Sequence, residues 1–260
     1  MNNINYENIL GFHIYNKTID NLIDNIYLKL NDDKKHTTKI TVSCLNPHSY
    51  IVSKENYIFK KALKKSTFII PDGVGIKLAS QIFFEKTIIQ TIPGPDFFIK
   101  FCEFTGDKYN HFFLGSTNEV LTNLTTNMQE KYNIKIAGYY SPPYKPKFTD
   151  KDNNMIIDEI NKSGATILWV GLTSPKQDIW IYENLDKLEN IKLASGIGAA
   201  FDFYGGTIER APEIFQKYGM EGYYRLYKEP RRIFKRAFVS DPLFVIDVIK
   251  KFIGEKLSGR

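Results

Sequence analysis

Short apolar runs alternate with longer amphipathic stretches along most of the chain. Six of the runs are typical of buried strands, because they are short, rich in β-branched or aromatic residues and closed by Gly, Pro, Asn or Ser; they are Lys39–Leu45, Thr67–Ile70, His111–Leu114, Ile134–Ala137, Thr166–Val170 and Ile191–Ala194. Between them, Asn118–Tyr132, Asp152–Lys162 and Pro175–Leu188 carry apolar residues near helical spacing. The alternation predicts an α/β fold with a mainly parallel sheet flanked by helices.

The last fifth of the chain has a different pattern, which is helical and strongly basic from Ala211 onward. We expect Asp241-Pro242 to break this pattern before a final amphipathic stretch, Leu243–Phe252. Residues 210–236 hold eight basic and three acidic residues, a net charge of +5 out of +6 for the whole chain. We therefore expect a core over residues 1–209 and a basic helical appendage over residues 210–260.

Composition narrows the classes of protein that fit. With 260 residues, 43% of them hydrophobic and 25% charged, the chain is globular rather than disordered. Two cysteines, Cys44 and Cys102, exclude a disulfide-stapled secreted scaffold. The N-terminus has no signal peptide pattern, and no stretch reaches the roughly 18 apolar residues of a membrane span. We expect a cytoplasmic protein that is soluble or bound to a membrane surface.

Loops that follow strands are the first candidates for a binding site, because ligands bind beyond the carboxyl ends of parallel strands. Three such loops contain glycine, at Gly115-Ser116, Gly171–Gln177 and Gly198. Glycine admits a close ligand, and amides at helix starts favour anions, so the loops indicate a nucleotide or diphosphate site. Ordinary turn chemistry is the alternative for each loop. The chain has neither a Walker loop nor a full GxGxxG, and a dinucleotide site rests on GIG alone.

Asp72 is the carboxylate that the pattern singles out, between Pro71 and Gly73 at the end of the second strand. It fits two roles, an N-cap for a helix starting near Val74 or a general base at the sheet edge. Asp202 lies among aromatic residues, which favours a structural or ligand-positioning role. Among four scattered histidines, His48 lies nearest a strand end and is the one to test.

The basic tail fits an anionic membrane surface. On a helix, Arg225, Arg232 and Lys235 share one face, and aromatic and apolar residues flank them. A nucleic acid and a simple solvated face are the alternatives. The apolar stretch Leu243–Phe252 favours membrane contact over nucleic acid.

Seven motifs in order, from about residue 40 to residue 236, resemble the WecG/TagA/CpsF glycosyltransferases. They are PDGVG (Pro71–Gly75), IPGPDFF (Ile92–Phe98), FFLGS (Phe112–Ser116), GYYSPPY (Gly138–Tyr144), VGLTSPKQDIW (Val170–Trp180), GIGAAFDFYGGTIERAPE (Gly196–Glu213) and YYRLYKEPRR (Tyr223–Arg232). The resemblance implies a Rossmann-like core and a C-terminal appendage that docks on the membrane and completes the active site.

The resemblance also implies an activity, the inverting transfer of a sugar from a UDP-sugar to a polyprenyl-diphosphate-linked saccharide. It also implies that the enzyme acts at the inner face of the cell membrane, in the synthesis of teichoic acid, capsule or exopolysaccharide. The base of the family falls on Asp72, and we place Cys44 and Asn46 beside it. We expect the donor to contact Gly115, Ser116, Gly171, Pro175, Gln177, Gly198 and Asp202. We expect the acceptor and the membrane to contact Arg210, Arg225, Arg231, Arg232, Lys235 and Arg236.

An inverting transferase needs one base and stabilisation of the departing diphosphate, which these residues could supply. Because no convincing DxD-like pair is present, we expect no obligatory metal and no other cofactor. A homo-oligomer is compatible with the sequence, and nucleic acid is not an expected partner.

Several positions depart from the family pattern. Cys44 stands where a Thr is usual, Gln90-Thr91 where an Arg is common, Asp178 where a Glu is usual and Gly222 where a Trp is usual. These departures suggest a different donor sugar. The alternative that they motivate is a non-catalytic, membrane-associated module that binds a nucleotide sugar or a lipid diphosphate. A nucleotide-dependent oxidoreductase is a third hypothesis, resting on GIG alone.

Overall fold

The computed structural model describes residues 6–32, 39–83, 88, 90–212, 214–215 and 221–257, without the side chains of residues 223, 225 and 231–233. An eight-stranded sheet runs through this part of the chain, in the order β1-β2-β4-β3-β8-β7-β5-β6. Its strands are β1 (Tyr6–Ile9), β2 (Phe12–Tyr15), β3 (Ile40–Leu45), β4 (Phe68–Pro71), β5 (Asn110–Gly115), β6 (Lys135–Tyr140), β7 (Ile167–Gly171) and β8 (Leu193–Gly196). Every neighbouring pair is parallel except β1 with β2.

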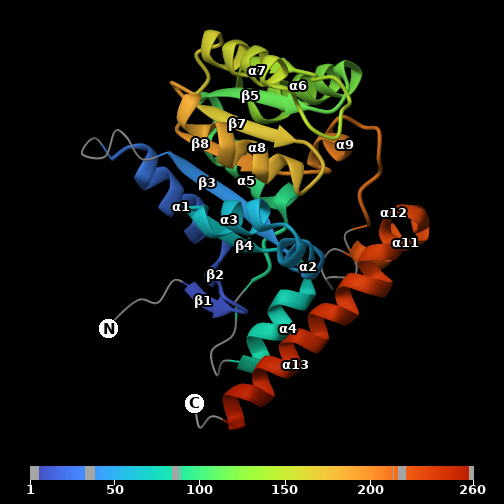
Figure 1. The fold of residues 1–260 in the computed structure, drawn as a ribbon. Helices are drawn as coiled ribbons and strands as arrows, with labels where there is room; N and C mark the ends of the chain where they lie inside the picture. The colour runs from blue at the N-terminus through green and yellow to red at the C-terminus, as the bar shows by residue number, and fades with distance from the viewer. Residues whose placement is uncertain are drawn as a thin grey trace.

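Helices cover both faces of the sheet (Figure 1). One face packs against α1 (Ile19–Leu30), α5 (Gly94–Thr105), α6 (Asn118–Tyr132) and α9 (Ala200–Tyr204). The other face packs against α2 (Pro47–Glu55), α3 (Tyr57–Lys65), α4 (Val74–Phe83), α7 (Asp150–Lys162) and α8 (Lys176–Asn184). Short helical turns η2 (Gly106–Lys108) and η3 (Leu185–Lys187) follow α5 and α8. The predicted α/β fold with helices on a mainly parallel sheet is confirmed.

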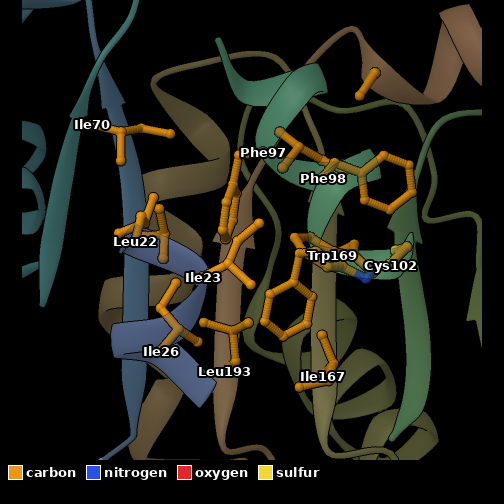
Figure 2. Packing of buried hydrophobic residues seen from close by; sticks show 14 of the residues in the cluster. Leu22, Ile23, Ile26, Ile70, Phe97, Phe98, Cys102, Ile167, Trp169 and Leu193 are labelled. Atoms are coloured by element: carbon orange, nitrogen blue, oxygen red, sulfur yellow. The ribbon is translucent and has the colours of Figure 1, made fainter. Parts of the chain in front are cut away.

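The largest apolar cluster lies between the sheet and helices α1 and α5, around Trp169 of β7 (Figure 2). The ring of Phe98 meets the Trp169 ring edge-on at 4.9 Å between centroids. Trp169 Nε1 donates a hydrogen bond to Nδ1 of the buried His111 at 2.9 Å. Burial lowers the pKa of His111 to about 3, so this histidine is a neutral core residue rather than a ligand.

The six predicted strands are all present, five of them within two residues at each end. The sixth, predicted at Ile134–Ala137, runs three residues further as β6, an edge strand whose residues are half-buried or exposed rather than buried. The hairpin of β1 and β2 at the N-terminus is a further element that the pattern did not predict. Leu10 and Gly11 form its turn with φ of 50° and 85°. This hairpin extends the parallel sheet by pairing β2 with β4.

The C-terminal part is helical, as predicted, and consists of α11 (Glu221–Lys228), α12 (Pro230–Lys235), the π-helical turn η4 (Arg236–Ser240) and α13 (Asp241–Leu257). The break expected at Asp241-Pro242 is wrong. Asp241 has helical φ and ψ of −64° and −44°, and η4 runs directly into α13. The turn directly before Pro242 is π-helical, with the N–H of Asp241 donating to the carbonyl oxygen of Arg236 five residues back, so the regular α-helical ladder is already interrupted where the proline lies.

Helix α13 packs back on the rest of the chain, along α4 and against α2 (Figure 1). Phe244 and Val248 are buried in a cluster with residues of α2, α3 and α4. Asp247 accepts hydrogen bonds from Tyr50 at 3.2 Å and from Lys54 at 2.5 Å. The division of the chain near residue 210 stays a prediction. Within the described ranges, none of the helices has the length and apolar content that crossing a bilayer requires.

Candidate active site

A cavity of about 550 Å³ opens beyond the carboxyl ends of β3, β4, β7 and β8. In the sheet, β3 lies between β4 and β8. From β3 the chain continues to β4 on one side, and it later forms β5, β6, β7 and β8 on the other side. The cavity therefore lies at the point where the strand order reverses, which is where open α/β sheets bind ligands. Residues of the C-terminal helices, Glu221, Gly222, Lys235 and Arg236, complete its wall.

Asp72 lines this cavity and is held by Asn46. Asn46 caps α2 through its Oδ1, which accepts from Ser49 N at 2.9 Å, and its Nδ2 donates to Asp72 Oδ2 at 2.9 Å. The backbone N of Asp72 donates to Leu45 O at 2.9 Å. Helix α4 begins at Val74. The carboxylate bonds with Asn46 and, among the described residues, not with the first turn of α4, which argues against the cap. The role of general base stays a prediction.

Cys44 lines the same cavity, directly before the turn that carries Asn46. A Cβ atom on Gly94 would lie 3.1 Å from its Sγ, so α5 packs closely against the thiol. Burial, together with the charges of Asp72 and Asp178, raises the pKa of Cys44 well above its usual value. The sulfur is therefore a neutral thiol, which can donate only a weak hydrogen bond.

The predicted donor residues divide into two groups. Gly171, Gln177, Gly198 and Asp202 line the cavity, and the buried Gln177 Oε1 accepts from Gly198 N at 3.1 Å. Gly115, Ser116 and Pro175 are described but do not line it.

Gly115 instead supports the cavity wall from behind. Its φ is +125°, and a Cβ atom there would lie 2.6 Å from the carbonyl oxygen of Gly171. Close packing of these two strand ends requires a glycine, because a side chain would push the Gly171 loop away. The Ser116 carbonyl oxygen accepts from Ser141 Oγ at 2.7 Å, so this residue ties the ends of β5 and β6 together.

Asp178 is a cavity residue that sequence reasoning did not place in the site. Ser174 Oγ donates to its Oδ2 at 3.4 Å, and its buried Oδ1 has no partner in the described part of the chain. Burial raises the pKa of Asp178 to about 6, although hydrogen bonds from Ser43 and Ser174 oppose the shift. The sequence signal was only that it follows Gln177 and replaces the usual Glu.

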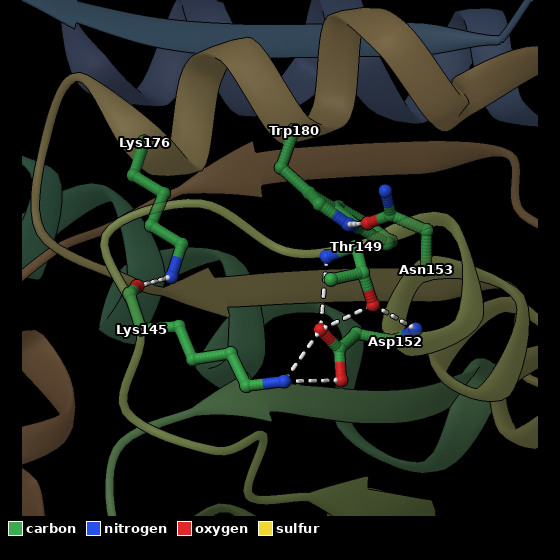
Figure 3. Close-up of polar contacts among 6 residues, drawn as sticks. All are labelled: Lys145, Thr149, Asp152, Asn153, Lys176 and Trp180. Atoms are coloured by element: carbon green, nitrogen blue, oxygen red, sulfur yellow. Dashed lines mark hydrogen bonds and ion pairs between the residues drawn. The ribbon is translucent and has the colours of Figure 1, made fainter.

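The first turn of α8, which carries Gln177 and Asp178, is fastened to the loop before α7 (Figure 3). Lys176 Nζ donates to the carbonyl oxygen of Lys145, and Trp180 Nε1 donates to Asn153 Oδ1 at 2.9 Å. Asp152 accepts from Lys145 at 2.9 Å and caps α7 together with Thr149. These contacts fix the turn of α8 against the cavity.

The residues predicted to meet the acceptor and the membrane are also divided. Lys235 and Arg236 line the cavity. Arg210 does not; its NH2 pairs with Asp96 of α5 at 2.5 Å and with Glu221 of α11 at 3.5 Å. Arg210 therefore ties the C-terminal helices to the core. The side chains of Arg225, Arg231 and Arg232 lie outside the described residues.

His48, the histidine that the sequence singled out, lines the cavity beside these helices. Its Nδ1 is 2.8 Å from Ser240 Oγ of η4. Burial, with the charges of Arg236 and Lys235, lowers the pKa of His48. The ring is therefore neutral near pH 7 and can share a hydrogen bond without adding charge.

Across the described ranges, no group of three or more His, Cys, Asp or Glu side chains is arranged to hold a metal ion. The arrangement provides one oriented carboxylate, backbone amides at the Gly171 and Gly198 loops, and cations from the last helices. Such a set can remove a proton from one group and stabilise a leaving anion.

Comparison with known proteins gives matches over nearly the whole chain. The sequence model of the glycosyl transferase WecG/TagA/CpsF family matches residues 7–258. The chain is 29% identical over 207 residues to N-acetylglucosaminyldiphosphoundecaprenol N-acetyl-beta-D-mannosaminyltransferase of Bacillus spizizenii, spanning 79% of this chain and 77% of that protein. It is 28% identical over 217 residues to the protein of the same name from Bacillus subtilis, spanning 83% and 81%.

Proposed function

The chain belongs to the WecG/TagA/CpsF family of glycosyl transferases, and we propose that it moves a sugar from a UDP-sugar to a saccharide linked to polyprenyl diphosphate. The names of the two Bacillus relatives support an undecaprenyl-diphosphate acceptor and an N-acetylmannosamine-like donor sugar. The observation that carries the proposal is the placement of Asp72, in one cavity with the loops of β7 and β8 and with the cations of the last helices.

Asp72 acts as the base in this proposal. Its carboxylate takes the proton of an acceptor hydroxyl while the hydroxyl oxygen attacks the anomeric carbon. The bond from that carbon to the UDP oxygen breaks, UDP leaves with the electron pair, and the configuration inverts. The bond from Asn46 Nδ2 holds Asp72 Oδ2 at 2.9 Å, which leaves Oδ1 to face the hydroxyl.

The departing diphosphate needs donors and positive charge. The Gly171 and Gly198 loops line the cavity at strand ends. The Gly198 amide itself donates to Gln177 Oε1 at 3.1 Å, so other amides of these loops would have to serve the diphosphate. Preorganised dipoles of this kind stabilise a leaving anion without reorganisation. We expect the reaction to need no metal and no other cofactor.

We further propose that the basic C-terminal helices dock on the inner, anionic face of the cell membrane. Helix α13 buries Phe244 and Val248 but leaves Ile246, Ile249 and Ile253 about half exposed. Lys250, the residue after Ile249, is exposed as well. Exposed apolar and basic residues on one helix suit a lipid interface. The product would then enter teichoic acid, capsule or exopolysaccharide synthesis.

A panel of UDP-sugars, beginning with UDP-N-acetylmannosamine, tests the activity on a short-chain polyprenyl-diphosphate-linked acceptor. Asp72→Asn should lower turnover about 10²- to 10⁴-fold, the contribution of a general base, with UDP affinity nearly unchanged. Asp158→Asn, on the exposed side of α7, is the matched control. Full turnover of Asp72→Asn would remove Asp72 from the reaction. Tight UDP binding without transfer to any acceptor would instead support the non-catalytic binding module.

A further inference from the structure

Three cationic side chains line the cavity. They are Lys77 of α4, Lys235 of α12 and Arg236 of η4. Elsewhere lysines pair, as Lys54 does with Asp247 and as Lys145 does with Asp152, but in the described part of the chain none of the three forms an ion pair. Lys77 and Arg236 are partly buried, Lys235 is exposed, and the charge of Arg236 also acts on the carboxyl group of Asp241. Cations that converge on one cavity favour an anion there.

Two acids of the same cavity have partners of their own, and burial raises the pKa of a third, Asp178, to about 6, which favours its neutral form. Glu221 pairs with Arg210, and Asp72 accepts from Asn46. The charges of Lys235 and Arg236 both act on His48, which places the two cations beside the first turn of α2. A Cβ atom on Gly75 would lie 2.5 Å from Pro47 Cγ, so the first turns of α2 and α4 are in contact. This contact brings α4, which carries Lys77, to the same wall.

An exposed apolar surface begins at this wall and runs away from it. On α4, Val74, Leu78 and Ile82 follow one another at four-residue spacing and are 42%, 51% and 42% exposed. Helix α13 lies alongside α4 (Figure 1). Both helices start near the cavity and run the same way, because Phe244 meets Tyr50 of α2 and Phe252 meets Phe83 at the far end of α4.

Positive charge at a cavity and an apolar surface leading out of it match an amphiphile with an anionic head. Lys235 and Arg236 are already expected to meet the acceptor; we propose that Lys77 of α4 joins them at the diphosphate of the lipid-linked acceptor, and that exposed residues of α4 and α13 contact its first isoprene units. This inference rests on the proposed function and assigns half of the lipid site to α4, a helix of the core. The donor also carries a diphosphate, but no hydrocarbon that would use the α4 surface.

Equilibrium binding to the full-length protein tests the assignment, with farnesyl diphosphate, inorganic pyrophosphate and UDP as separate probes. Lys77→Met should lower the affinity for farnesyl diphosphate about tenfold, the effect of losing one charge-assisted contact. It should lower the affinity for UDP less than twofold. Lys60→Met, an exposed lysine on α3 outside the cavity, is the control for lost charge alone. Leu78→Asn, at an exposed site that the fold does not need, should weaken farnesyl diphosphate but not pyrophosphate.

Two results would overturn the assignment. If Lys77→Met behaves like Lys60→Met, Lys77 does not contact the diphosphate. If Lys77→Met lowers the affinity for UDP as much as the affinity for farnesyl diphosphate, the cations bind the donor. Failure of the wild-type protein to bind farnesyl diphosphate overturns it as well. Because binding needs no turnover, these outcomes stay distinct from failure of the proposed function, which shows as failure to bind UDP or to transfer sugar.

Discussion

The buried carboxyl group of Asp178 should make the stability of the fold depend on pH, and Asp178→Asn should remove that dependence. The side chain is 5% exposed, and its Oδ1 has no partner among the described residues. Burial raises the pKa of Asp178 from 3.8 to about 6. Since the folded pKa exceeds the unfolded one, the folded state binds more protons between these values. The free energy of unfolding is then highest below about pH 4 and falls as pH rises through about 6.

The size of the effect follows from the two pKa values. One pKa unit corresponds to about 1.4 kcal/mol, so a shift of about two units lowers the free energy of unfolding by about 3 kcal/mol above pH 7. At pH 5 the loss is about half as large, because the folded carboxyl group is still protonated. Asn keeps the shape of the side chain without the charge, and the hydroxyls of Ser43 and Ser174 can reverse their hydrogen bonds to it.

Urea unfolding at pH 5 and pH 8 measures the prediction. Asp178→Asn should exceed the wild-type protein in free energy of unfolding by up to about 3 kcal/mol at pH 8 and by about half of that at pH 5. Other carboxyl groups with raised pKa values, such as Glu7 and Glu221, cancel in this difference. The free energy of unfolding of Asp158→Asn should differ from that of the wild-type protein by the same amount at pH 5 and at pH 8. An Asp178→Asn protein no more stable than wild type at pH 8 would refute the reasoning.

Further predictions follow from single contacts. Gly115→Ala should lower the free energy of unfolding by about 1–3 kcal/mol in a thermal melt, since its Cβ would meet the Gly171 carbonyl at 2.6 Å; an unchanged melting temperature would contradict this. Arg210→Met leaves two carboxylates without their cation and should speed proteolytic release of the C-terminal helices. Cys44, whose pKa is raised, should react with iodoacetamide at pH 7.5 more slowly than a free peptide thiol. Phe244→Ala should lower the free energy of unfolding by about 3–5 kcal/mol in urea.

The parallel strands were predictable from the sequence because each is a short run rich in apolar and β-branched residues that ends at a turn residue. The hairpin of β1 and β2 was not, because Tyr6–Ile9 and Phe12–Tyr15 are four residues each and alternate buried with exposed positions. Its turn, Leu10-Gly11, lacks the Asn or Asp before glycine that marks most two-residue hairpins. The tail was misjudged at Asp241-Pro242, because a proline inside a helical pattern usually ends the helix, whereas here a π-helical turn precedes the proline and the helix continues.

Cavity residues could be predicted where they follow strands that are neighbours at the point where the strand order reverses. Asn46, Asp72 and Gly198 follow β3, β4 and β8, which are neighbours in the sheet. Gly115 follows β5, which lies beyond β7 from that point, so it supports the cavity without lining it. Strand order is a tertiary property that local pattern does not contain. Lys77 lies inside a helix and has no sequence signal of its own.

Removing the chain after residue 210 would be a poor test of membrane docking. The C-terminal helices are joined to the core through Arg210, through His48 with Ser240, through Asp247 with Tyr50 and Lys54, and through the buried Phe244. Truncation would remove two cavity cations and also uncover apolar residues of α2 and α4 that α13 covers. Loss of activity would then follow from instability as readily as from lost docking. Substitutions at exposed apolar positions such as Ile249 and Ile253 leave these contacts intact. They therefore test membrane affinity without disturbing the cavity.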